Sequence, residues 1–194
     1  MRETEAKLIV KDRKIFDRIS RMGHILDFSL KPVGRFLQRD IYYDTADRKL
    51  AGCGAVCRIR EVDGDKVITF KRRVGYEKGV SEREELEVPL EEGSTDPIQR
   101  MRELTGEDLL KVLEVENQRT VFHLVKGDEV HFELVLDDVT FRGHRGTQRY
   151  LEIELERKRG SKEDMLKIAE FLKGEFDLMS SPKSKYEIGL EAVG

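Results

Sequence analysis

The chain has 194 residues, which suffices for one domain with a hydrophobic core. Charged residues make up 39 % of it, yet 36 Lys and Arg nearly balance 39 Asp and Glu. This balance argues against an entirely basic surface, so nucleic-acid and membrane binding are not expected. No apolar run approaches the roughly 18 residues of a membrane helix, and a start at Arg2 and Glu3 is unlike a signal peptide. A cytoplasmic protein is therefore expected.

Most of the elements predicted in the N-terminal half of the chain are strands. Residues 2–10 alternate charged and apolar side chains, which predicts a strand with Glu3, Glu5 and Lys7 on one face. Apolar residues at helical spacing then predict a helix that begins at Asp12 and ends at Gly23. Alternation predicts further strands over 36–43, 55–62, 66–72 and 81–88, with a hairpin turn at 63–65 and a basic loop over 72–79.

The C-terminal half continues in the same way. Asp96 and Pro97 predict the start of a helix that ends near Leu104. Strands are predicted over 110–125, 130–139 and 149–156. Ser161 and Asp164 predict a capping box for a second long helix, and a short amphipathic tail closes the chain. The expectation is a single α+β domain over 1–194, antiparallel and strand-dominated, with three or four helices.

The two cysteines do not suggest a metal site. Cys53 and Cys57 have no further Cys or His ligands at suitable spacing, so we expect ordinary buried thiols. One Asn and four Gln beside abundant Lys, Arg and Glu form the composition found in thermophile proteins.

The predicted strands share an unusual property. Each has an apolar face, and the opposite face carries two or three charges, such as Glu85 with Glu87 or Arg58 with Arg60. A solvated open sheet explains any single strand of this kind. Like charges repeated strand after strand nevertheless repel unless something neutralises them. A closed barrel with helices outside and charges inside satisfies the whole pattern.

Such an interior suggests two kinds of ligand. Carboxylates would hold a divalent cation, and oxygen-only ligands suit Mg²⁺ or Mn²⁺ rather than Zn²⁺. Arginines and lysines would hold a polyanion, most naturally phosphate, which a guanidinium binds with a bidentate fork. There is no GxxxxGK[ST] motif, so phosphate would be bound by side chains. The pattern therefore predicts a metal–polyphosphate site.

Glu3-Thr4-Glu5-Ala6-Lys7 resembles the ExExK signature of CYTH-domain proteins, the triphosphate tunnel metalloenzymes, which include class IV adenylate cyclases and thiamine triphosphatases. An ordered series of further motifs extends the resemblance to about residue 187. The series comprises Tyr42-Tyr43-Asp44-Thr45, Arg58-Ile59-Arg60, Thr69-Phe70-Lys71, Arg83-x-Glu85-x-Glu87, Arg119, Leu136-Asp137-x-Val139, Glu152-Ile153-Glu154 and Ser184-Lys185-Tyr186.

The resemblance implies a closed eight-stranded antiparallel β-barrel, a triphosphate tunnel, with helices packed outside. It implies phosphate binding by Lys7, Arg58, Arg60, Lys71, Arg83, Arg119 and Lys185, with Lys183 as a substitute for Lys185. It implies Glu3, Glu5, Glu152 and Glu154 as the main ligands of Mg²⁺ or Mn²⁺, assisted by Glu85, Glu87 and Asp137. A tunnel carboxylate, among Glu3, Glu5, Glu85 and Glu87, would activate the nucleophile.

Three functions follow from the resemblance. A metal-dependent triphosphatase acting on inorganic triphosphate or an organic or nucleoside triphosphate is favoured, because we find no adenine-recognition pattern. A class IV adenylate cyclase that makes cyclic AMP from ATP is the first alternative. A non-catalytic polyphosphate-binding module is the second, and it would have less need of the carboxylates. The expected partner is a small-molecule triphosphate, and a homodimer is a further expectation.

Overall fold

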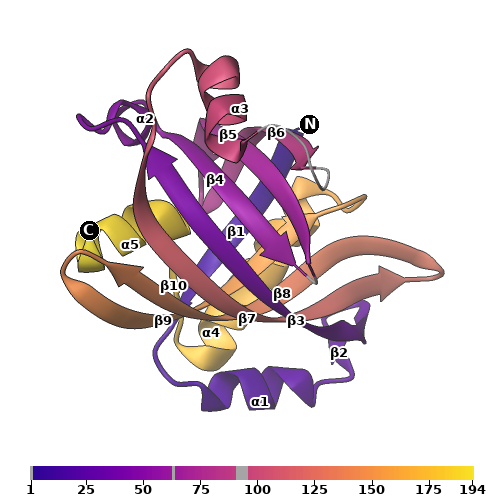
Figure 1. Ribbon diagram of the computed structural model, residues 1–194. Helices are drawn as coiled ribbons and strands as arrows, with labels where there is room; N and C mark the ends of the chain where they lie inside the picture. Colours follow the sequence, from indigo (N-terminus) through magenta and orange to yellow (C-terminus); the bar gives the residue numbers. More distant parts are fainter. Residues whose placement is uncertain (1, 63, 91–95) are drawn as a thin grey trace.

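The computed structural model describes residues 2–62, 64–90 and 96–194, and eight long strands form a closed antiparallel barrel (Figure 1). Their order around the barrel is β1-β6-β5-β4-β3-β7-β8-β9, and β9 pairs back onto β1. The strands are β1 (Arg2–Val10), β3 (Phe28–Asp44), β4 (Ala55–Val62), β5 (Asp65–Glu77), β6 (Val80–Leu90), β7 (Leu110–Lys126), β8 (Glu129–Gly143) and β9 (Gly146–Arg157). The predicted eight-stranded barrel is thus confirmed.

Closure sorts the side chains of every strand into an inner and an outer set, because successive residues point to opposite faces. In β1, Glu5 and Lys7 point inward, whereas Ala6 and Leu8 are buried under helices outside. Two short strands extend the sheet beyond the barrel: β2 (His24–Ile25) pairs with β3, and β10 (Met179–Ser180) pairs with β1.

The described part of the chain contains five helices, more than the three or four predicted. They are α1 (Lys14–Ser20), α2 (Lys49–Gly52), α3 (Pro97–Thr105), α4 (Lys162–Phe176) and α5 (Lys185–Val193). Helices α1 and α4 lie together against one side of the barrel (Figure 1), and they share a core with the outward residues of β1, β8 and β9. Ser161 caps α4 by accepting from the backbone N–H of Asp164, as predicted.

Helix α5 differs from the others because it packs on residues that face the barrel interior. Leu113 of β7 and Phe141 of β8 contact it, and they lie on the same strand faces as Arg119 and Asp137. Gly189 permits the close approach, since a Cβ there would lie 2.4 Å from Leu113 Cδ2. The helix therefore closes one end of the barrel.

Several predicted boundaries were wrong. The basic loop over 72–79 is mostly strand, because β5 continues to Glu77 and pairs with β6, with a register shift between Arg73 and Gly75. The strand predicted over 36–43 begins at Phe28, and the C-terminal tail is helix α5. The turn at 63–65 includes Asp63, which lies outside the described residues.

Of the two thiols, Cys57 is buried as predicted, whereas Cys53 is exposed. Cys53 lies at the end of the short helix α2, which the sequence pattern did not indicate. No helix in the described part of the chain is long and apolar enough to cross a membrane.

Replacing Gly189 by Ala is expected to lower the free energy of unfolding by about 1–3 kcal/mol, because the added methyl group overpacks the α5 interface. Gly174→Ala, at an exposed position of α4, is the matched control, because a Cβ there would meet no atom of the described residues within 4 Å. Because alanine is the better helix former, the control is expected to gain about 0.5–1 kcal/mol. Urea denaturation measures both, and equal changes would contradict the tight packing of α5.

Candidate functional site

The interior of the barrel contains a cavity of about 280 Å³ that is lined almost entirely by charged side chains. Twelve of the fifteen residues predicted for the site line it. The basic ones are Lys7, Arg58, Arg60, Lys71, Arg83, Arg119 and Lys185, and the acidic ones are Glu3, Glu5, Glu85, Glu87 and Glu154. Asp137, Glu152 and Lys183 do not line it. The structure thus brings most of the predicted set together around one space.

At the wall formed by β3 and β4, two arginines share one carboxylate. Arg60 donates two hydrogen bonds to Asp40, at 2.8 and 2.9 Å, and Arg58 Nη1 lies 3.2 Å from Asp40 Oδ2. Burial acts to raise the pKa of Asp40, but the charges of Arg58 and Arg60 outweigh it and hold the pKa far below its usual value. Asp40 therefore stays ionised and fixes both guanidinium groups.

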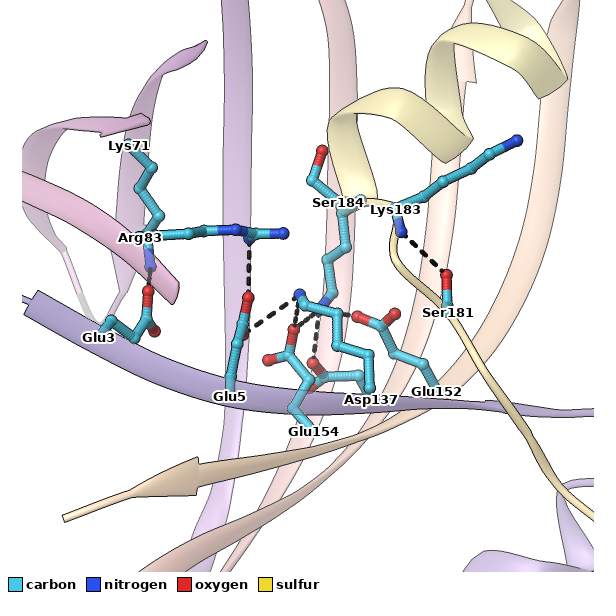
Figure 2. A network of polar contacts seen from close by, with 12 residues as sticks. Glu3, Glu5, Lys71, Arg83, Asp137, Glu152, Glu154, Ser181, Lys183 and Ser184 are labelled. Carbon is cyan, nitrogen blue, oxygen red and sulfur yellow. Dashed lines mark hydrogen bonds and ion pairs between the residues drawn. The ribbon is translucent and has the colours of Figure 1, made fainter. Parts of the chain in front are cut away.

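At the wall formed by β1, β5 and β6, acids of one strand pair with bases of the next. Arg83 Nη1 lies 2.8 Å from Glu5 Oε1, and Lys71 Nζ lies 2.8 Å from Glu3 and 3.0 Å from Glu85. The register accounts for these pairs: Lys71 lies opposite Glu85, and Arg83 lies opposite Glu3 and reaches Glu5 on the same face of β1. Figure 2 shows the contacts of Lys71 with Glu3 and of Arg83 with Glu5.

Deeper in the barrel, Glu154 is the centre of a denser cluster. Its carboxylate accepts from Lys7, from Arg119 at 2.6 Å and from Lys185 at 2.9 Å. Arg119 also donates two hydrogen bonds to Asp137, at 2.9 and 2.7 Å. Figure 2 shows Glu154, Asp137 and Glu152 converging on one point. Acids and bases therefore alternate in space, although like charges follow one another along a strand.

These charges are maintained against burial. Burial acts to lower the pKa of Lys185 and Lys7, but neighbouring carboxylates outweigh it and raise both values. Burial likewise acts to raise the pKa of Glu154, and the charges of Lys185, Lys7 and Arg119 bring it well below its usual value. Of the three carboxylates Asp137, Glu152 and Glu154, Glu152 is the one whose pKa is raised, because burial dominates there.

The two lysines near the C-terminus take different positions. Lys185 is the first residue of α5 and is buried, with its ammonium against Asp137 at 2.8 Å, Glu152 and Glu154. Lys183 precedes the cap of the helix and is exposed, and its side chain pairs with Glu191. Figure 2 shows its side chain directed away from the cluster around Glu154. Of the two, Lys185 is the one that the fold directs into the barrel.

Three buried carboxylates could hold a metal ion. Asp137, Glu152 and Glu154 offer oxygens that all lie within 4.8 Å of one another. Glu152 Oε2 is buried and has no hydrogen-bond partner among the residues that the structure describes. This donor set of carboxylate oxygens fits a hard divalent cation. Lys185 contacts all three residues, so a cation bound there would replace the lysine ammonium at the carboxylates.

Five residues that line the cavity were missing from the predicted site: Tyr42, Val56, Val135, Glu156 and Ser184. Asp40, which pairs with the arginines from behind, was missing as well. Two of them had a detectable signal. Glu156 shares the strand face of Glu152 and Glu154, and Asp40 is a charge in the middle of a predicted strand. Ser184 lies at the cavity because it caps helix α5, and the sequence pattern did not predict this helix.

Replacing Glu154 by Gln is expected to lower the free energy of unfolding by about 3–5 kcal/mol, because it leaves buried cations without their counter-charge. Glu87→Gln is the matched control, since Glu87 is an exposed acid at the cavity margin, and it is expected to change stability by less than about 0.5 kcal/mol. Urea denaturation at neutral pH measures both. An unchanged midpoint for Glu154→Gln would show that the buried pairs contribute nothing.

Known proteins resemble the chain in sequence. An inorganic triphosphatase of Haemophilus influenzae is 29 % identical over 154 residues, which are 76 % of this chain and 44 % of that protein. The chain thus spans less than half the length of this relative. A candidate adenylate cyclase of Methanocaldococcus jannaschii is 28 % identical over 155 residues, which are 79 % of this chain and 77 % of that protein.

Solved structures share the fold. A candidate adenylyl cyclase from Hippeastrum, described as having a dominant triphosphatase activity, superposes with a TM-score of 0.68 at 23 % identity and covers 99 % of this chain and 97 % of that one. A protein of Pyrococcus horikoshii superposes with a TM-score of 0.64 at 22 % identity, over 98 % and 99 % of the two chains. The sequence pattern of the CYTH domain matches residues 1–187. The chain therefore belongs to the CYTH domain family.

Proposed function

We propose that the protein is a metal-dependent triphosphatase that hydrolyses inorganic triphosphate, or an organic or nucleoside triphosphate, inside the barrel. The observation that carries the proposal is the cavity of about 280 Å³, where seven Lys and Arg side chains face six carboxylates. Such a set of cations around one cavity suits a polyphosphate chain, whose oxygens accept hydrogen bonds from guanidinium and ammonium groups. The inorganic triphosphatase of Haemophilus influenzae, at 29 % identity, supports the same reading.

Binding would proceed by exchange of ion-pair partners. The guanidinium groups of Arg58 and Arg60 are held by Asp40, and Lys71 is held by Glu3 and Glu85. These cations are therefore already oriented toward the cavity before a polyanion arrives. Phosphate oxygens would take over the donors that point into the cavity, and prior orientation of the donors saves the cost of reorganising them during reaction.

The acidic side would hold Mg²⁺ or Mn²⁺. Glu3, Glu5 and Glu154 line the cavity and would be the ligands nearest the phosphates, with Asp137 and Glu152 behind Glu154. When bound, the metal neutralises charge on the phosphoryl group that is transferred. A carboxylate among Glu3, Glu5, Glu85 and Glu87 would orient the attacking water and take its proton. The water forms a new bond to the terminal phosphorus while the bridging P–O bond breaks. The products are orthophosphate and the shortened phosphate chain, which keeps the bridging oxygen.

A second candidate is an adenylate cyclase, because the relative from Methanocaldococcus jannaschii and the Hippeastrum structure carry that description. A cyclase must also seat adenine. Of the residues that line the described cavity, only Tyr42, Val56, Val135 and Ser184 are uncharged, which leaves little apolar surface for a base. This composition favours the triphosphatase. A non-catalytic polyphosphate-binding module is the third candidate, and it would have less need of the carboxylates.

Incubation of the purified protein with inorganic triphosphate and, separately, with ATP tests the three candidates by their products. With Mg²⁺ or Mn²⁺ we expect release of orthophosphate from inorganic triphosphate and no cyclic AMP, and with a chelator we expect no turnover. Phosphate assay and chromatography of the nucleotides measure the outcome. Cyclic AMP from ATP would support the cyclase, and tight binding without turnover would support the binding module.

The neighbouring lysines provide a matched pair for the phosphate-binding role. Lys185→Gln is expected to lower kcat/KM for inorganic triphosphate about 100-fold, because it removes a buried charge that faces the cavity. Lys183→Gln is expected to leave kcat/KM within about twofold, since its side chain pairs with Glu191 outside. Steady-state kinetics measure both. Equal losses, or loss only in Lys183→Gln, would contradict the assignment of Lys185.

A further inference from the structure

The first turn of α5, which begins at Lys185, is attached to the barrel on two sides. Tyr186 donates a hydrogen bond to Asp44 at the end of β3, and Glu187 pairs with Arg73 of β5. These two residues directly follow Lys185 in the sequence. Contacts that hold Tyr186 and Glu187 in place therefore also hold the backbone of Lys185, from which its side chain enters the cavity.

The attachment to Asp44 is rigid. Asp44 is fully buried, and its Oδ2 accepts from the Tyr186 hydroxyl at 2.7 Å and from the Ala51 N–H at 3.0 Å. Its Oδ1 accepts from the N–H groups of Thr45 and Leu50. The Tyr186 ring also stacks on Tyr42, with centroids 5.2 Å apart and planes 10° from parallel. Asp44 thus joins β3, α2 and α5 at one point.

The attachment to Arg73 acts on the helix cap. Arg73 Nη2 donates to Glu187 Oε2 at 2.7 Å and to the Pro182 carbonyl at 3.0 Å. The same Glu187 oxygen accepts from the N–H and the hydroxyl of Ser184, which complete a capping box at the start of α5. Arg73 therefore holds both the chain that enters the helix and the carboxylate that caps it.

Arg73 and Tyr186 line a much smaller space beside the cavity, which has Lys71, Arg83 and Ser184 in common with it. Among the residues that the structure describes, Arg73, Asp44 and Tyr186 are not ones that line the cavity, whereas Lys185 is. The lysine side chain is long and flexible, and burial with Asp137, Glu152 and Glu154 restricts it only while its backbone stays in place. A small displacement of the first turn would move the ammonium away from all three carboxylates.

We propose that Arg73 and Tyr186 are positioning residues, which hold the first turn of α5 so that Lys185 reaches the phosphate-binding cavity. The proposal rests on the proposed function, because it assigns Lys185 to a triphosphate. Arg73 and Tyr186 touch no substrate in this scheme. They act through Lys185, and their effect on substrate binding depends on that lysine being present.

The test compares Arg73→Gln with Arg72→Gln, each in the wild-type and in the Lys185→Gln background. Arg72 is the matched control, because its exposed side chain pairs with Glu84 on the outside of the same hairpin. We expect Arg73→Gln to raise KM for inorganic triphosphate about fivefold in the wild-type background and to have almost no effect beside Lys185→Gln, as is typical of coupled neighbours. Arg72→Gln should leave KM unchanged in both backgrounds, and Arg73→Lys should restore most of the affinity.

A second readout does not depend on activity. In the ligand-free protein, the rate at which an amine-reactive ester labels Lys185, followed by peptide mass spectrometry, should rise about tenfold in Arg73→Gln and stay unchanged in Arg72→Gln. Tyr186→Phe keeps the ring stacking, removes only the hydroxyl, and should raise the rate as well. It serves as the second variant if Arg73→Gln does not fold.

Two results would overturn the proposal. One is an unchanged labelling rate of Lys185 in folded Arg73→Gln and Tyr186→Phe. The other is an equal loss of affinity in the two backgrounds, which would mean that Arg73 acts without Lys185. If the wild-type protein neither binds nor hydrolyses inorganic triphosphate, the proposed function fails, and the labelling rate alone decides whether Arg73 and Tyr186 position the lysine.

Discussion

Charge pairing inside a closed sheet is the constraint on which the rest of this structure depends. Closing the barrel removes one face of every strand from bulk water, and each charge on that face loses several kcal/mol of hydration. A buried ion such as Glu154 is tolerated because Lys7, Arg119 and Lys185 surround it. The interior therefore holds acids and bases in nearly equal numbers, which contributes to the small net charge of the chain.

The same pairing prepares the cavity for a ligand that carries charge. Two guanidinium groups converge on Asp40, and Lys71 is shared by Glu3 and Glu85. In an apolar cavity these side chains would have no reason to adopt one arrangement. Here the carboxylates hold the cations at the cavity wall, so that an arriving polyanion meets donors that are already in place. Stability and ligand binding draw on the same ion pairs.

Helix α5 contributes to the barrel in two ways. It fills one end of the barrel, where Gly189 allows it to lie against Leu113 and Phe141. It also supplies Lys185, the only residue from a helix whose charge enters the cavity among those described. A barrel made of strands alone would leave this end open to water, and the buried ion pairs near Glu152 would then be hydrated and weaker.

The sequence by itself determined the strand alternation and indicated a closed barrel. The eight strands and the twelve cavity residues came from the resemblance of its motifs to CYTH-domain proteins. Alternation along one strand is local, so β1 and β4 were predicted residue by residue. The tertiary structure alone decided that Lys185 and not Lys183 enters the barrel, because a helix cap at Ser184 separates them. It also decided that Asp40 pairs with two arginines of another strand. Such choices depend on register and on helix placement, and those follow from packing between segments far apart in the chain.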